Sequence, residues 1–288
     1  MKHLLGLLRI KEYVKNIIVF APLFFSAELF DSWLIGNTML VFVAFCLLSS
    51  SVYIFNDLVD IQQDRQHPEN KFRPLASGAV KKIPAIILAI ALFSSSLGLT
   101  LFLNTEVLFV LLSYVGINIL YSFWLKGFAL VDVFVISLGI ILRLLAGSLA
   151  TGIVLSDWIL LLTLFLSVFL VLGKRRQYLV LFNNEGNKFR KSLSGYSQNY
   201  IDLIMIMMAS VIIAIYVMYS ISPEVQLRTG NEYFKLTSVW IILAFMRYFQ
   251  LIFVMGKIKS PVHLFFEDAF LIIIVMLWVL SCFFLIYF

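Results

Sequence analysis

The chain has 288 residues, of which 62% are hydrophobic and only 13% are charged, and its formal net charge is +6. A mean hydropathy of +1.00 excludes an ordinary soluble domain and indicates a polytopic membrane protein. In a soluble chain this positive charge would suggest a nucleic-acid partner. Here it fits basic loops at a membrane surface, so we expect a lipid bilayer and no nucleic acid.

Nine apolar segments reach or approach the length of about 20 residues that a helix needs to cross a bilayer. They are residues 15–31, 34–55, 83–103, 107–125, 130–151, 158–173, 202–221, 236–255 and 269–287. The first segment contains Pro22 and is short. We therefore predict an all-α membrane protein with nine transmembrane helices, forming one domain over residues 1–288.

The basic residues predict the orientation of these helices. If the N-terminus is cytoplasmic, most of the 22 Lys and Arg residues fall in cytoplasmic segments, and the excess alternates through every loop. We expect the N-terminus inside, the C-terminus outside and a location in the inner (plasma) membrane. Self-association into a homo-oligomer is left open.

The most polar stretch in the chain is residues 56–74, NDLVDIQQDRQHPENKFRP, directly after the second apolar segment. On a continuous helix, Asp57, Asp60 and Asp64 would share one face, with Asn56 on its flank. Three stacked carboxylates repel one another unless a cation lies between them, and hard oxygen ligands suit Mg²⁺. A solvated loop is the alternative, but the basic residues that follow, Arg65, Lys71 and Arg73, favour a magnesium-diphosphate site.

Two charged side chains lie inside the fifth apolar segment, where a charge costs several kcal/mol unless it is paired or hydrated. Asp132 and Arg143 are 11 residues apart. That is about three helical turns, or roughly 16 Å, so they are too far apart to pair. We expect each to face the interior and to find its partner on another helix or on a ligand. Arg247, in the eighth segment, is a similar but weaker case.

Several groups of polar residues border the apolar segments on the predicted cytoplasmic side. Tyr121 and Lys126 end the fourth segment, residues 173–176 read GKRR after the sixth, and residues 11–16 read KEYVKN before the first. Each could be only an aromatic belt or a topology signal. Arginine and lysine also bind phosphate oxygens. The cations of this second reading are Lys15, Lys126, Lys174, Arg175 and Arg176, with Lys188, Arg190 and Lys191 nearby.

An acidic cluster and several cationic groups at one membrane face predict a site for two anionic partners, one of them bridged by Mg²⁺. A transporter would instead place its polar groups near the middle of the bilayer. A non-enzymatic membrane carrier is therefore the less favoured alternative.

The pattern NDxxDxxxD, formed by Asn56, Asp57, Asp60 and Asp64, resembles the first aspartate-rich motif of the UbiA superfamily of intramembrane prenyltransferases. The pair Tyr121 and Lys126 also resembles that superfamily. The resemblance implies nine transmembrane helices around a central cavity that opens to the cytoplasmic face. Most members carry a second aspartate-rich motif after the sixth helix, where this chain has GKRR.

This replacement, together with residues 9–16, 49–78 and 130–147, resembles one branch, the decaprenyl-phosphate phosphoribosyltransferases. Departures at Ile10, Tyr13 and Tyr178 leave the acceptor lipid and its chain length open. The branch implies transfer of 5-phosphoribose from phosphoribosyl diphosphate (PRPP) to a polyprenyl phosphate, for a cell-envelope glycan precursor. The alternative within the superfamily is transfer of a prenyl group onto an aromatic or quinone precursor.

The polar groups described above and the resemblance together give a hypothesis for the roles of particular residues. Asp57, Asp60, Asp64 and Lys126 would be catalytic, and Asn56 and the three aspartates would hold Mg²⁺. The substrate-binding residues would be Lys15, Asn16, Asn56, Arg65, Arg73, Tyr121, Asp132, Arg143, Lys174, Arg175 and Arg176.

Overall fold

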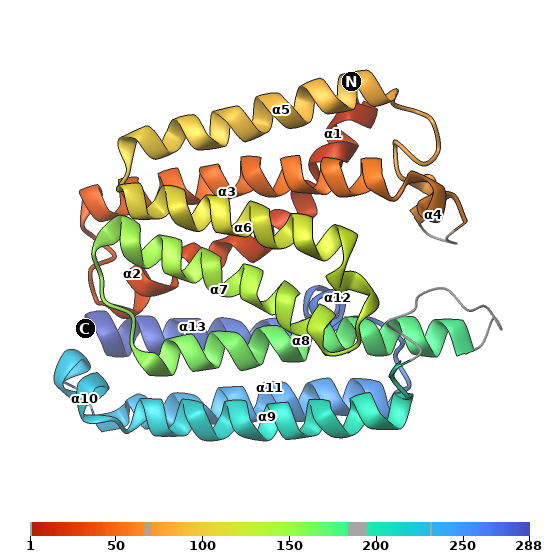
Figure 1. Cartoon of the computed structure of the whole chain (residues 1–288). Helices are drawn as coiled ribbons and strands as arrows, with labels where there is room; N and C mark the ends of the chain where they lie inside the picture. The colour runs from red at the N-terminus through yellow and green to blue at the C-terminus, as the bar shows by residue number, and fades with distance from the viewer. Residues whose placement is uncertain (1, 67–69, 184–194, 231) are drawn as a thin grey trace. The chain divides into compact units, whose positions relative to one another are not determined.

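A computed structural model describes residues 2–66, 70–183, 195–230 and 232–288, and every regular element in these residues is a helix (Figure 1). Within them, eight helices are long and apolar enough to cross a membrane. These eight coincide with the second to ninth predicted segments, which confirms the all-α prediction for the described residues.

The first predicted segment, residues 15–31, differs from the others. It contains the 3₁₀ helix η1 (Ile10–Phe20) and the short helix α2 (Ala21–Phe25). Pro22 lies in the first turn of α2, a position where a residue without a backbone N–H is tolerated. Ala27, shortly after α2, has a positive φ of 67°. The count of nine spans therefore stays a prediction.

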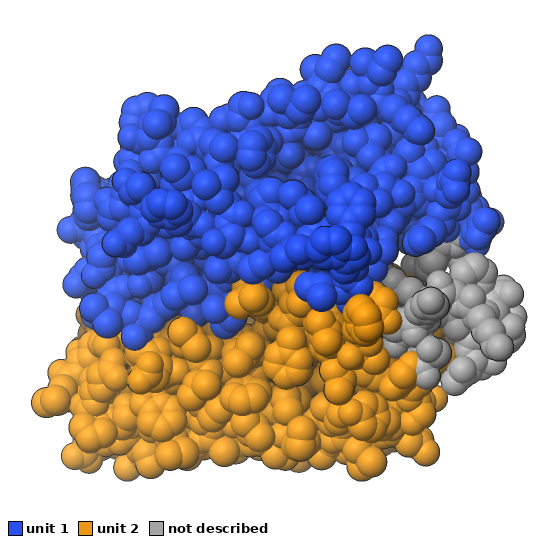
Figure 2. Space-filling view, in the orientation of Figure 1, with its two compact units in different colours: residues 1–126, 139–155 blue, residues 127–138, 156–288 orange. Residues whose placement is uncertain are grey.

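The chain divides into two compact units, which are described separately (Figure 2). Unit 1 comprises residues 1–126 and 139–155, and unit 2 comprises residues 127–138 and 156–288. Helix α7 (Val131–Thr151) contributes its first residues to unit 2 and its remainder to unit 1.

Unit 1 is built around the long helix α3 (Ser32–Val59), which packs against α1, η1, α5 and α6 (Figure 1). Asp31 caps its start by accepting hydrogen bonds from the backbone N–H groups of two residues in its first turn. The other elements of unit 1 are α1 (Lys2–Leu8), α4 (Ile61–Gln66), η2 (Asn70–Phe72), α5 (Lys82–Leu99), η3 (Thr100–Phe102) and α6 (Thr105–Phe123). The short turn η4 (Leu125–Gly127) begins in unit 1, and its last residue belongs to unit 2.

Two serine side chains join α3 to α5. Ser51 Oγ donates to the carbonyl oxygen of Ala89 over 2.9 Å, and Ser96 Oγ donates to that of Ala44 over 2.8 Å. Small hydroxyl residues let two helices approach closely in an apolar setting and hydrogen-bond across the contact. α3 is thereby held along its length, and its C-terminal end carries the acidic motif.

Unit 2 contains four of the long helices, with α8 packed on α9 and α11 on both α9 and α13 (Figure 1). Its elements are α8 (Asp157–Asn183), α9 (Gln198–Ser220), α10 (Pro223–Thr229), η6 (Glu232–Thr237), α11 (Ser238–Phe249), the π-helical turn η7 (Gln250–Val254), α12 (Pro261–Glu267) and α13 (Ala269–Tyr287). Buried Phe169, Leu172, Ile201 and Met205 belong to its core.

Arg247, for which the sequence made a weaker case than for Asp132 and Arg143, has a structural role in unit 2. Its guanidinium contacts both carboxylate oxygens of Asp268, at 3.1 Å and 2.8 Å. Asp268 also caps α13 by accepting from the backbone N–H of Leu271. The hydrogen bond from Arg247 lowers the pKa of Asp268, so this carboxylate keeps its charge at the helix N-terminus. The ion pair ties α11 to α13.

Candidate active site

The acidic motif lies where α3 ends. The helix stops at Val59, and Asp60 is its C-cap, with φ −96° and ψ 11°, before α4 begins at Ile61. The expectation that three aspartates share one face of a continuous helix is therefore wrong, because the backbone bends at the second aspartate. Asp57 and Asp64 are brought together, whereas Asp60 takes a different partner.

One arginine joins the first and last aspartates of the motif. Arg73 Nη1 lies 3.1 Å from Oδ1 of Asp57 and 2.7 Å from Oδ2 of Asp64. Both carboxylates are buried, with 3% and 5% exposure. Asn70 Nδ2 donates to the remaining oxygen, Oδ1, of Asp64 over 2.9 Å. A single cationic atom between two buried carboxylates is the arrangement that also suits a metal ion.

Asp57 has a second cationic partner that the sequence did not single out. Arg9 Nη2 forms an ion pair with the same oxygen, Oδ1, that contacts Arg73. The two residues are 48 positions apart in the chain, so only the fold brings them together. The signal available in the sequence was that Arg9 opens the stretch 9–16 that carries the family resemblance.

Asp60 pairs with Lys126 instead. Lys126 Nζ donates to Asp60 Oδ1 over 2.6 Å, and both side chains are partly exposed. The structure therefore brings these two predicted catalytic residues together, at the edge of the cluster rather than between Asp57 and Asp64.

Two further predicted residues have structural contacts. Asn56 Oδ1 accepts a hydrogen bond of 2.5 Å from Ser122 Oγ on α6, next to the predicted Tyr121. Arg65 Nε donates to the carbonyl oxygen of Ala76 over 3.0 Å. Arg65 thus holds the loop that carries Arg73, and Ser122 is a neighbour of the motif that sequence reasoning missed.

The cluster can be tested for its fit to Mg²⁺. No group of three acidic, histidine or cysteine side chains converges as a metal site within the described residues. Mg²⁺ does not require one, because it is usually held by one or two carboxylates together with substrate phosphates. Asp57 and Asp64 supply such a pair around one point, which Arg73 Nη1 occupies in this structure. The residues therefore fit a metal that arrives with a diphosphate.

Arg143 lies in a second polar cluster of unit 1 and is 4% exposed. Its Nε donates to Asn16 Oδ1 over 2.6 Å, and its Nη2 donates to Tyr114 Oη over 3.0 Å. The guanidinium also lies 4.7 Å from the Tyr114 ring centroid, a cation–π distance. Lys15, one residue before Asn16, forms an ion pair with Glu12. The expectation that Arg143 finds its partners on other helices is confirmed.

In unit 2, the buried Asp132 and Arg175 are partners. Arg175 Nη2 lies 2.7 Å from Asp132 Oδ2, and the two residues are 3% and 0% exposed respectively. Tyr196 Oη donates to Asp132 Oδ1 over 3.2 Å and accepts from the backbone N–H of Leu130 over 2.6 Å. Burial raises the pKa of Tyr196 to about 12, so its hydroxyl remains a donor. Asp132 thus finds its expected partner on another helix.

The other three residues of the GKRR motif each have a different environment. Arg176 Nε donates to Asp202 Oδ1 over 2.6 Å, and its guanidinium lies 5.5 Å from the Phe253 ring centroid. Lys174 is exposed. A Cβ on Gly173 would lie 2.2 Å from Pro261 Cγ, so α12 packs where only glycine fits. The predicted cations Lys188, Arg190 and Lys191 lie outside the described residues.

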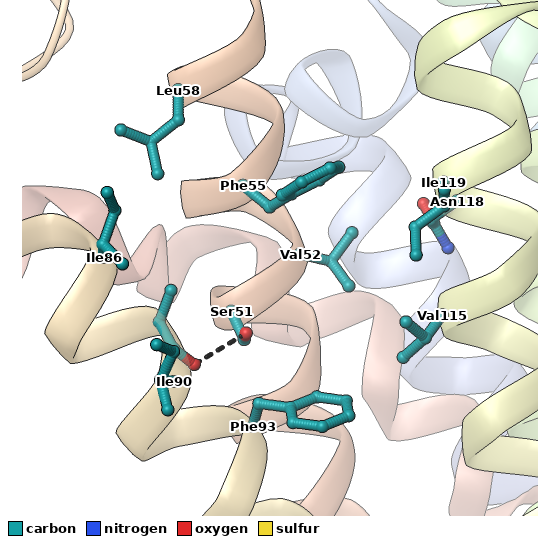
Figure 3. A pocket seen from close by; sticks show the side chains of 11 residues that line it. Ser51, Val52, Phe55, Leu58, Ile86, Ile90, Phe93, Val115, Asn118 and Ile119 are labelled. Atoms are coloured by element: carbon teal, nitrogen blue, oxygen red, sulfur yellow. Dashed lines mark hydrogen bonds between the residues drawn. The ribbon is translucent and has the colours of Figure 1, made fainter. Parts of the chain in front are cut away.

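An apolar cavity of about 250 Å³ lies in unit 1 between α3, α5 and α6 (Figure 3). Its lining includes Val52, Phe55, Ile90 and Phe93 and contains no charged side chain. The hydroxyl of Ser51, on its wall, is already bonded to Ala89 (Figure 3). This cavity suits hydrocarbon, whereas an anionic substrate requires the cluster around Asp57.

Comparisons with known proteins agree with this geometry. A family model described as the UbiA prenyltransferase family matches residues 16–174. The decaprenyl-phosphate phosphoribosyltransferase of Corynebacterium glutamicum is 34% identical over 246 residues, which are 84% of this chain and 74% of that protein. The enzyme of the same name from Mycobacterium tuberculosis is 32% identical over 84% of this chain and 80% of its own length.

Solved structures have the same fold. A UbiA homologue from Archaeoglobus fulgidus, bound to DMAPP and Mg²⁺, superposes with a TM-score of 0.71 at 19% identity, over 99% of each chain. Together with the apolar helices, these matches indicate an integral multi-pass membrane protein and an enzyme. The chain belongs to the UbiA prenyltransferase family.

Proposed function

We propose that the chain transfers 5-phosphoribose from PRPP to a polyprenyl phosphate and releases diphosphate. The observation that carries the proposal is the single cationic atom shared by the buried carboxylates of Asp57 and Asp64. The curated relatives support the choice of reaction, since both are named decaprenyl-phosphate phosphoribosyltransferases.

The donor would bind in unit 1. Mg²⁺, held by Asp57 and Asp64 with further support from Asn56 and Asp60, would neutralise charge on the diphosphate as it leaves. A divalent metal is supported by the solved homologue with bound Mg²⁺. Arg73 would bind phosphate oxygens through its planar guanidinium, and Lys126, oriented by Asp60, would supply a second charge. Arg65 would act indirectly, by holding the loop before Ala76.

The two other polar clusters would serve as binding groups for the phosphate monoesters of the substrates. We assign the exposed Lys174, with Arg175 and Arg176, to the phosphate of the polyprenyl acceptor. The carboxylates of the buried Asp132 and the partly exposed Asp202 would fix the positions of the two arginines. Lys15, Asn16, Tyr121 and Arg143 would bind or position the donor.

In the reaction, an oxygen of the lipid phosphate forms a bond to the anomeric carbon of PRPP. The bond from that carbon to the diphosphate oxygen breaks, and its electron pair leaves with diphosphate. The attacking phosphate is already anionic at neutral pH, so no strong general base is required. The chain's residues would contribute chiefly by positioning and by electrostatic stabilisation.

The membrane arrangement is also a proposal. We propose nine spans forming one domain, a central cavity open to the cytoplasm, and an N-terminus inside and C-terminus outside the inner membrane. The alternation of basic segments supports this orientation. Exposed Ser77 and Gln226 fall on opposite sides in this topology. S77C should react with an impermeant thiol reagent only from the cytoplasmic side and Q226C only from outside. Labelling of both from one side would contradict the arrangement.

The function is tested with purified protein in lipid nanodiscs, Mg²⁺, PRPP and polyprenyl phosphates of several chain lengths. We expect a lipid whose mass has increased by one phosphoribosyl group, with release of diphosphate. If no polyprenyl phosphate is modified while a prenyl diphosphate reacts with an aromatic acceptor, the chain is a prenyltransferase instead.

A further inference from the structure

Arg9 has no role in the function proposed so far, although it contacts the centre of the acidic cluster. Its Nη2 and Arg73 Nη1 both contact Oδ1 of Asp57, a carboxylate that is 3% exposed. The Arg9 side chain itself is 25% exposed, so it reaches the cluster from the solvent-accessible side. Two guanidiniums thus occupy one of the two carboxylate oxygens that Asp57 could offer to a metal ion.

The backbone of Arg9 adopts a conformation that is unusual for a residue with a side chain. Its φ of 50° and ψ of 49° are left-handed, at the N-cap of η1. The Arg9 carbonyl accepts a hydrogen bond of 2.8 Å from the backbone N–H of Glu12. The guanidinium also lies 5.1 Å from the ring centroid of Tyr53. This cation–π contact with the Tyr53 ring would hold the Arg9 guanidinium without a contribution from Asp57.

We propose that Arg9 is a donor-binding residue that exchanges partners. Without substrate it neutralises Asp57, and when a magnesium-bound diphosphate arrives it releases the carboxylate to the metal and binds a phosphate oxygen. This inference rests on the proposed function, and it adds a diphosphate-binding residue that the sequence analysis did not single out. No charged group is left unpaired by the exchange, because each carboxylate and each guanidinium still has an opposite charge beside it.

The exchange predicts that removing the charge of Arg9 changes metal affinity and donor affinity in opposite directions. Arg9 competes with a divalent cation for Asp57 when no donor is present, so removing its charge should strengthen metal binding. With the donor present, the same change removes a charge-assisted hydrogen bond and should weaken diphosphate binding. A purely structural role would weaken both, and a role in phosphate binding alone would change only the second.

The test compares Arg9→Gln and Arg9→Lys with wild-type protein, and uses Lys81→Gln as the matched loss of one exposed charge. Mn²⁺ affinity is measured without donor by electron paramagnetic resonance, and PRPP affinity at fixed Mg²⁺ by calorimetry. We expect Arg9→Gln to bind Mn²⁺ more tightly and PRPP about tenfold or more weakly, the loss of one charge-assisted bond. Lys81→Gln should change neither constant.

Other outcomes are equally decisive. Unchanged constants, a loss in both, or tighter Mn²⁺ binding with unchanged PRPP binding would each overturn the exchange. If Arg9→Gln does not fold, Arg9→Lys decides, because it keeps the charge but loses the planar fork and must still weaken PRPP binding. If wild-type protein binds no PRPP, the proposed function fails, whereas the Mn²⁺ comparison still tests whether Arg9 competes for Asp57.

Discussion

Lys126 Nζ lies 2.6 Å from Asp60 Oδ1 and joins the C-terminal end of α3 to η4. Asp60 thus has a different cationic partner from the other two aspartates, which share Arg73. The motif therefore contains two structurally distinct parts, a buried carboxylate pair that shares one cationic atom and a partly exposed carboxylate that pairs with a lysine.

A double-mutant cycle tests this division. Asp60→Asn should lower kcat mainly by loosening Lys126, so that it adds little to the loss caused by Lys126→Met. We expect a coupling of about 0.5–3 kcal/mol in the transition-state free energy, as for residues in direct contact. Asp31→Asn is the control, because asparagine caps a helix as well as aspartate does. Strictly additive losses from Asp60→Asn and Lys126→Met would show that the pair does not act together.

The buried cluster around Arg143 should respond to loss of an acceptor. Asn16→Ala leaves Arg143 Nε without its 2.6 Å partner, and a hydrogen bond to a charged group contributes about 1.5–3 kcal/mol. We expect the free energy of unfolding in detergent to fall by that amount. Asn37→Ala, which removes a 3.3 Å bond to the neutral carbonyl of Ala150, should cost about 1 kcal/mol or less. Equal losses in the two variants would contradict the role of the buried charge.

The glycine of the GKRR motif is required for packing. Gly173→Ala would place a Cβ 2.2 Å from Pro261 Cγ, and such overpacking costs about 1–3 kcal/mol of stability. Gly116→Ala in α6 meets no atom within 4 Å and should be neutral or stabilising by about 0.5–1 kcal/mol. Pro261→Ala should partly restore the stability of Gly173→Ala. Thermal unfolding of the four proteins checks the prediction, and a Gly173→Ala variant as stable as wild type would refute it.

Tyr196 should make stability depend on alkaline pH. Burial raises its pKa to about 12, above the value of about 10 in an unfolded chain. The neutral hydroxyl therefore stabilises the fold fully below about pH 10, and this contribution is lost as the pH rises from about 10 towards 12. The difference in unfolding free energy between wild type and Tyr196→Phe should be constant below that range and then decline. A decline that begins near neutral pH would contradict the buried environment of Tyr196.

The long helices could be predicted from hydropathy, because their segments have a high mean hydropathy despite a few internal charges. The charges inside them could also be predicted to need partners, and Asp132 and Arg143 have them. The structure of the first segment, residues 15–31, was harder to predict, since an apolar run does not distinguish a 3₁₀ helix from an α-helix. In η1, Val19 O would lie 2.1 Å from a Cβ on Gly147, and this close tertiary contact is not visible in the local sequence.

The site could be predicted only by residue type. The prediction that the three aspartates share one face assumed that α3 continues through the motif. Nothing local in residues 56–64 marks the end of the helix at Val59. The bend coincides with tertiary pairs, Asp60 with Lys126 and Asp57 with Arg9, whose members are 66 and 48 positions apart. Asp202, the partner of Arg176, was missed for the same reason.

The most direct test of the proposed reaction follows two labels in PRPP, one in the ribose and one in the diphosphate. With Mg²⁺ and a polyprenyl phosphate, the wild-type protein should transfer the ribose label to the lipid phase and release the diphosphate label into water. Asp57→Asn, which removes a carboxylate of the central pair, should lower both rates together by about 10²-fold or more. Retention of both labels in the aqueous PRPP pool, with every acceptor tried, would contradict phosphoribosyl transfer.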